Sequence, residues 1–158
     1  ALEQLAESGS NVEFIAQAPV VASIASDGVV MPGTSSTITL TTSDETATHL
    51  TLSTMLVNTN DAFTGLTGLE LSNLTVDTAM TWHLNVYDAG TEGNTESAGT
   101  IPGPADGGEG FNEARDDTNV VSYHSGVVSQ DDGLTSSVLT QAHRFDNPAI
   151  MLTITRTK

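Results

Sequence analysis

The chain of 158 residues contains no cysteine, which excludes disulfide bonds and metal sites built on thiolates. Only 4 residues are basic against 20 acidic ones, and the formal net charge is −16. Such a charge repels nucleic acids and anionic membranes, and it attracts divalent cations. No run of about 18 apolar residues is present, so the sequence predicts no membrane span. The absence of cysteine is compatible with export, and the acidic charge suits a salty or calcium-rich medium.

Polar and apolar residues alternate in several short stretches, a pattern typical of strands with one face in water. Little helix is predicted between them, so the sequence favours one domain, residues 1–158, folded as an antiparallel β-sandwich. Trp82 is the only tryptophan and is expected to anchor the core. The expected strands cover residues 20–24, 36–41, 50–57, 67–71, 73–76, 80–87, 120–124 and 149–156.

Two stretches of the chain lack the strand pattern, one at the start and one between residues 88 and 119. Apolar residues three and four positions apart predict a short helix at residues 1–9, and a second helical turn is expected at 12–18. Residues 88–119 are rich in Gly, Pro, Asp, Glu and Asn and contain few apolar side chains. A loop of this length in a compact domain is either functional or mobile.

Two aspartates, Asp61 and Asp88, each follow the end of an expected strand. If both loops lie at the same end of a sandwich, the carboxylates point at one place. Calcium is held by six to eight hard oxygen ligands from carboxylates, carbonyls and water, so the pair predicts a calcium site. The alternative is that the aspartates cap turns, which is a common role of this residue.

A third acidic ligand has two candidate sources. Glu92 or Glu96 could complete the site from the loop that begins at Asp88. Asp44 and Glu45 form an acidic turn before the strand that leads to Asp61, which puts them at the opposite end unless that strand bends. An enzyme is the least favoured interpretation: His124 or His143 could serve a hydrolase, but no Gly-x-Ser-x-Gly turn accompanies them.

Five motifs stand in order along the chain: MLVNTNDAFTGL at residues 55–66, YDAGTE at 87–92, IPGP at 101–104, GEGF at 108–111 and NPAIMLTITR at 147–156. Together they resemble the spondin amino-terminal domain family, in particular its bacterial branch. The resemblance runs from about Leu2 to Arg156, and residues 87–92 match a fairly specific signature of the family.

This resemblance implies a C2-like antiparallel β-sandwich with a short amino-terminal helix and a calcium ion at one end. It implies that Asp61 and Asp88 match two ligand positions, and that an upstream glutamate falls near Glu45, with Asp44 as its neighbour. It also implies extracellular work, namely binding to matrix or a surface ligand and cell adhesion.

The chain departs from the family in one respect. Family members usually have a strand before the helical Leu-x-x-Leu-Ala-Glu-x-Gly stretch, which here occupies residues 2–9. We therefore expect a missing amino-terminal strand and an open sheet edge, which another chain, such as a neighbouring copy in a filament, would fill. The expected function is a secreted, non-enzymatic bacterial calcium-binding protein for adhesion or assembly, with a filament subunit as the alternative.

Overall fold

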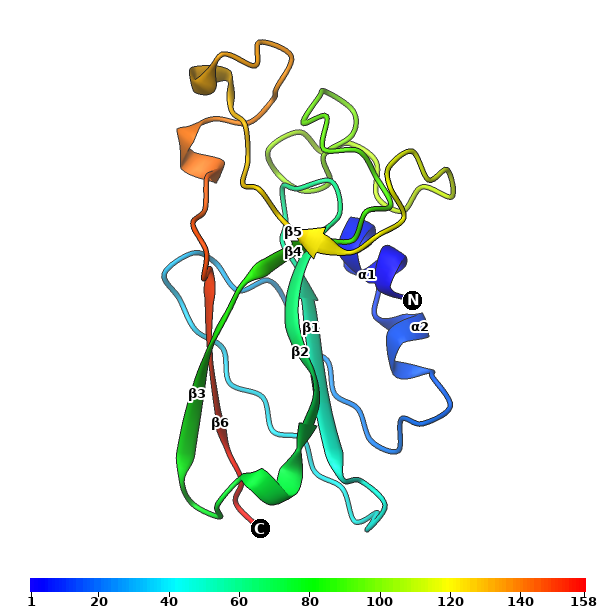
Figure 1. Ribbon diagram of the computed structural model, residues 1–158, viewed down its shortest axis with the longest axis vertical. Helices are drawn as coiled ribbons and strands as arrows, with labels where there is room; N and C mark the ends of the chain where they lie inside the picture. The colour runs from blue at the N-terminus through cyan, green and yellow to red at the C-terminus, as the bar shows by residue number, and fades with distance from the viewer.

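Figure 1 shows the computed structural model, which describes residues 1–158. None of its helices has the length and apolar character needed to cross a membrane. The helices are α1 (Leu2–Ser8) and α2 (Val12–Ile15), with the 3-10 turns η1 (Leu71–Asn73), η2 (Gln130–Asp132) and η3 (Gln141–His143). The strands are β1 (His49–Met55), β2 (Ala62–Glu70), β3 (Ala79–Leu84), β4 (Val86–Asp88), β5 (Ser122–Tyr123) and β6 (Ile150–Thr155).

The strands form two antiparallel sheets. The larger has the order β1-β2-β4-β5, and the smaller consists of β3 and β6. In Figure 1, β3 and β6 run along one side of the molecule and β1 and β2 along the other, while the long loops gather at the upper end. The predicted β-rich class and short amino-terminal helix are confirmed. That helix ends at Gly9, which adopts the left-handed conformation that glycine permits.

The stretch expected to be a single strand at residues 80–87 is divided between the sheets. Leu84 pairs with Ile150 in the small sheet, whereas Val86 pairs with Thr64 in the large one. The chain changes sheet at Asn85, whose carbonyl accepts a hydrogen bond of 2.7 Å from the hydroxyl of Thr64. This switch carries the chain into β4 and so determines where Asp88 lies.

Some expected strands have other boundaries in the structure. Residues 67–70 continue β2 rather than forming a strand of their own, and Leu71 begins η1. Residues 120–124 contribute only the two residues of β5. Residues 73–76 contain no strand, because η1 occupies their start and only Val76 makes a single β-bridge.

The apolar core is small, with only 23 of 158 residues buried. Its main cluster, made by Ile101, Val127 and Leu139, lies among the loops and not between the sheets. Trp82, the expected core anchor, is only half-buried. It lies in the smaller sheet, which has just two strands.

The strands expected at residues 20–24 and 36–41 do not form. Residues 16–46 have no regular structure, and all of them are exposed except the half-buried Ala22. Alternation describes a side-chain pattern that suits a sheet, but a strand exists only where a neighbouring backbone accepts and donates its hydrogen bonds. No such neighbour lies beside these residues.

We predict that Gly65→Ala destabilises the fold. A Cβ at this position would lie 2.1 Å from the carbonyl oxygen of Leu52, so β1 and β2 would have to separate. We expect the free energy of unfolding to fall by roughly 1–3 kcal/mol, the usual cost of overpacking. Chemical denaturation measures it. The matched control is Gly28→Ala, which meets no atom within 4 Å and should leave stability unchanged; equal stability of the two variants would contradict the close approach.

Candidate metal site

Asp61 and Asp88 lie side by side at one end of the large sheet. Asp61 immediately precedes β2, and Asp88 is the last residue of β4. Ala62 pairs with Asp88 in the antiparallel register, and the backbone N–H of Ala89 donates to the carbonyl of Asp61 at 3.2 Å. The structure therefore brings together the two aspartates that the sequence predicted to share one end of the fold.

The carboxylate of Asp61 is fully buried, with 0% of the residue exposed. Its Oδ2 accepts from the backbone N–H of Thr91 at 2.7 Å, from the Thr91 hydroxyl at 3.2 Å and from the backbone N–H of Glu92 at 3.1 Å. Its Oδ1 is buried and has no hydrogen-bond partner. Burial raises the pKa of Asp61, the hydrogen bonds oppose this, and the charge of Asp88 raises the pKa further, so the net direction is upward.

The carboxylate of Asp88 holds the start of the following loop. Its Oδ1 accepts from the backbone N–H of Gly90 at 2.7 Å, and its Oδ2 accepts from the side-chain amide of Asn94. Gly90 has φ 71°, and a Cβ there would lie 2.5 Å from the carbonyl oxygen of Val120. Both the positive φ and this close approach require glycine, which explains its place in the YDAGTE motif.

Glu92 joins the same region and is almost completely buried. Its Oε1 accepts from the side-chain amide of Asn60 at 3.0 Å, whereas its Oε2 is buried without a partner. Burial raises the pKa of Glu92 to about 7, and the negative charges of Glu7, Glu109 and Asp61 add to the effect. Burial of an ionised carboxylate without compensation is costly, so this side chain takes up a proton more readily than an exposed glutamate.

Glu7 belongs to the same acidic cluster, although sequence reasoning did not select it. It lies on α1 and is buried; its Oε1 accepts from the Thr91 hydroxyl at 2.6 Å and its Oε2 from the backbone N–H of Asn112 at 3.0 Å. Burial raises the pKa of Glu7. The Thr91 hydroxyl has one proton to share between Glu7 and Asp61. The only sequence signal was an acid at position 7 within the helical Leu-x-x-Leu-Ala-Glu motif.

We call Glu7, Asp61, Asp88 and Glu92 the acidic cluster. None of its members takes part in an ion pair, because the three ion pairs of the structure join Ala1 to Glu13, Arg115 to Glu3 and Arg144 to Asp132. No group of three or more His, Asp or Glu side chains is arranged to hold a metal ion. The cluster is therefore an uncompensated concentration of buried carboxylates rather than a complete ligand cage.

His124 is buried beside the acidic cluster. Its Nδ1 accepts from the backbone N–H of Gly126 at 3.0 Å, so the neutral ring carries its proton on Nε2, which is buried and has no partner. Burial lowers the pKa of His124, whereas the charges of Asp88 and Asp61 raise it, and the net direction is downward. In this tautomer Nε2 is a hydrogen-bond donor and cannot coordinate a metal.

Three further predicted ligands lie elsewhere. Asp44 and Glu45 are exposed in the loop before β1, and β1 runs its full length between them and the end where Asp61 lies (Figure 1). Asp44 caps its own turn, accepting from the N–H of Thr46 at 2.8 Å. The structure thus corrects the assignment of either residue as the third ligand. The register of β1 shifts between Leu50 and Leu52, but this irregularity does not bring the acidic turn round to the end that holds Asp61. Glu96 is buried but directs both oxygens to the backbone N–H of Val128.

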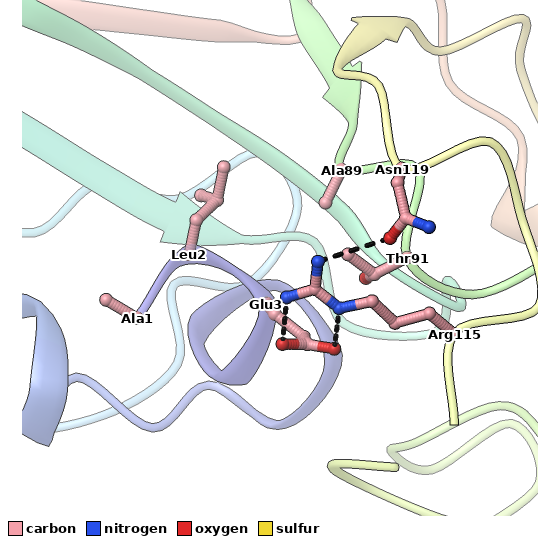
Figure 2. Close-up of a pocket in the computed structure, with 7 residues that line it drawn as sticks. All are labelled: Ala1, Leu2, Glu3, Ala89, Thr91, Arg115 and Asn119. Atoms are coloured by element: carbon pink, nitrogen blue, oxygen red, sulfur yellow. Dashed lines mark hydrogen bonds and ion pairs between the residues drawn. The ribbon is translucent and has the colours of Figure 1, made fainter. Parts of the chain in front are cut away.

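A pocket of about 210 Å³ opens next to the acidic cluster and is lined by Thr91 and Ala89. Figure 2 shows Arg115 crossing it. The guanidinium donates to both oxygens of Glu3 at 2.8 and 2.6 Å and to the side chain of Asn119 at 3.2 Å. This bidentate pair fastens the loop that carries Arg115 to α1, close to Glu7.

A scan against protein-family models, a search of the curated proteins and a search of the solved structures each found no match to this chain. The assignment to the spondin family therefore stays a prediction from the motifs.

The raised pKa of Glu92 predicts how stability varies with pH in the presence of a chelator. The ionised form is disfavoured in the fold, so between pH 4.5 and about 7 the folded state binds more protons than the unfolded state. The free energy of unfolding should fall as the pH rises through this range. Asp61 and Glu7 act in the same direction.

Glu92→Gln keeps an acceptor for Asn60 but cannot ionise, so its stability should decrease less between these pH values than that of the wild type. Denaturant unfolding at several pH values measures this. Glu113→Gln is the matched control, because Glu113 is exposed; it should follow the wild type. Identical pH profiles for Glu92→Gln and the wild type would show that Glu92 ionises freely.

Proposed function

We propose that this chain is a secreted, non-enzymatic calcium-binding protein with a C2-like β-sandwich of the spondin type, acting in adhesion or extracellular assembly. The observation that carries the proposal is the carboxylate of Asp61, fully buried beside Asp88, with one oxygen lacking any partner and with no basic side chain paired to it. Buried charges in proteins are paired or coordinate metals.

A cation bound at the acidic cluster would reduce the free-energy cost of burying these carboxylates. It would give a partner to the unbonded oxygens of Asp61 and Glu92. It would also offset the burial of charge and the repulsion that together raise the pKa of both carboxyl groups. Asp61, Asp88 and Glu92 are the residues that would hold it. Because no three side chains form a ready cage, backbone carbonyls and water would supply the other ligands, as calcium allows.

The donor set favours calcium over transition metals. The available atoms are hard oxygens, the chain has no cysteine, and the tautomer of His124 presents a donor and not a lone pair at Nε2. An ion bound here would tie the end of β4 to the turn before β2, and so hold the loop of residues 89–119 at the end of the sheet. In adhesion, that loop is the surface presented to a matrix or cell-surface ligand.

A hydrolase finds little support. The Nδ1 atoms of His124 and His143 both accept from backbone N–H groups of their own loops, Gly126 and Thr140 respectively. Ser125 makes no hydrogen bond to its neighbour His124. A nucleophile needs a base within hydrogen-bond reach, and neither histidine stands in that relation to a serine side chain.

Calcium should raise the melting temperature of the protein, and a chelator should reverse the effect. A ligand that binds only the folded state stabilises it by about 2.7 kcal/mol at a hundredfold excess over its dissociation constant. Asp61→Asn and Asp88→Ala should each abolish the response, since each removes a charged ligand. Differential scanning calorimetry with and without calcium measures it.

Asp44→Asn is the matched control, because it removes an equally acidic side chain at the far end of β1 and should keep the calcium response. A melting curve of the wild type that does not change with calcium would refute the metal site. Loss of the response in Asp44→Asn as well would show that calcium acts through net charge and not through the acidic cluster.

A filament subunit completed by a strand from a neighbouring chain is the second candidate function. It is favoured by the accessible surface of 9502 Å², because a folded monomer of this mass exposes about 7,500 Å². The smaller sheet has two strands and therefore two open edges, and β1 leaves a third edge unpaired. Exposed edges recruit strands from other chains.

We therefore expect the purified wild-type protein to form assemblies larger than a monomer. Light scattering coupled to size exclusion measures the mass, and electron microscopy distinguishes filaments from closed oligomers. Assembly is expected with and without calcium if the metal is incidental to it. A monodisperse monomer at every concentration would refute this second function.

A further inference from the structure

Residues 34–43 have the sequence of a strand but lack the bonds of one. They read TSSTITLTTS, with polar and apolar positions alternating and without a charged residue. Ile38 and Leu40, their two large apolar side chains, are 45% and 41% exposed. In Figure 1 the light-blue stretch that includes this segment runs obliquely down to the lower end of β1.

The backbone of residues 35–43 in this segment is exposed and forms no hydrogen bonds with other backbone groups of the chain. The hydrogen bonds on either side are turn bonds, from Thr34 to Met31 and from Ala47 to Asp44, and no backbone N–H or carbonyl of residues 35–43 bonds to another part of the backbone. An extended, uncharged segment with free donors and acceptors on both sides is a template for pairing with a sheet edge.

An added strand would stabilise the smaller sheet more than the larger one. A two-stranded ribbon is marginal alone, and three strands with an apolar face are needed for stability. Three cross-strand pairs, Met80–Ile154, Trp82–Leu152 and Leu84–Ile150, give its two strands a common apolar face. Of these six side chains only Leu84 is buried. A third strand beside β6 would extend this face and place its own side chains against those of β6.

Charge identifies the partner as a second copy of this chain. Copies with a net charge of −16 repel one another over most of their surface. Residues 34–43 and β6 carry no charge, and β6 is followed by Arg156 and Lys158, two of only four basic residues. Two copies that meet through residues 34–43 and β6 therefore repel one another less than copies that meet through their acidic surfaces. Because every copy holds both parts, the contact repeats head to tail.

The exposed area agrees with such a contact. The surface exceeds that of a compact monomer of this mass by about 2,000 Å². A standard interface buries about 800 Å² on each partner. A subunit in a head-to-tail chain has two interfaces, so the excess corresponds to what it would bury.

We propose that residues 34–43 of one copy add as an edge strand to β6 of the next copy, extending the two-stranded sheet to three strands. The inference deepens the proposed role in assembly and rests on it, but not on the metal.

Proline substitutions test the segment. Backbone N–H groups an odd number of residues apart point to opposite sides of a strand, so in Ser36→Pro/Thr39→Pro one proline removes a donor that faces β6. The monomer uses neither N–H group, so it should unfold at an unchanged temperature. Light scattering should show that the double proline variant is a monomer, while the control Ser36→Ala/Thr39→Ala assembles like the wild type.

Cross-linking tests the edge. Because the chain has no cysteine, Thr39→Cys can be mixed with a second variant that carries one cysteine at Met151, Thr153 or Thr155, and any mixed disulfide must join two copies. Neighbouring strands bring Cα atoms within the 4.4–6.8 Å that a disulfide spans. We expect a cross-link at one of these positions and none to Ser53→Cys on β1.

The outcomes separate this inference from the proposed function. If the wild type is always monomeric, this inference and the filament function are both refuted, whereas the metal site is decided separately by the calcium response. If the proline variant assembles like the wild type, or if Thr39→Cys cross-links to β1 and not to β6, assembly stands and the assignment of segment and edge is overturned. Assembly lost only in the proline variant, with the β6 cross-link formed, supports the proposal.

Discussion

The pairing of β2 with β4 is the contact on which the rest of the acidic end depends. It sets Ala62 opposite Asp88, so that two aspartates 27 positions apart in the sequence become neighbours. From there the carboxylate of Asp61 reaches the N–H groups of Thr91 and Glu92, and the Thr91 hydroxyl reaches Glu7 on α1. One register thus connects the amino-terminal helix, the large sheet and the start of the long loop.

This end of the molecule combines burial with uncompensated negative charge. Structural ion pairs usually repay part of the cost of burying a carboxylate, yet Arg115 and Arg144 pair with acids outside the acidic cluster. Arg156 donates to backbone carbonyls instead. Hydrogen bonds from Thr91, Asn60 and the backbone stabilise the ionised forms only in part, since the pKa values of Asp61 and Glu92 remain raised. Uptake of protons by these carboxyl groups lowers that cost, and the proposed cation would do the same.

The body of the molecule differs from this end, because its sheets have open edges and much of its apolar surface is exposed. The main apolar cluster lies among the loops, and the face shared by β3 and β6 is only partly covered. A cluster of buried polar groups therefore organises one end, while the apolar surface that normally stabilises a two-sheet fold is available for contact with another molecule. Assembly and ion binding would in this way stabilise different parts of the same chain.

Local sequence patterns determined the β-rich class, the helix that ends at Gly9, the clear last strand and the positions of Asp61 and Asp88 close to strand ends, because periodicity and turn chemistry act over a few residues. Tertiary structure alone decided the change of sheet at Asn85, the placing of Glu7 against Thr91 84 positions away, and the removal of Asp44 and Glu45 from the site. It also decided that residues 36–41 form no strand. These outcomes depend on which backbone segments lie next to each other. Alternation of polar and apolar residues shows that a segment suits a sheet, but it does not determine which other segment pairs with it.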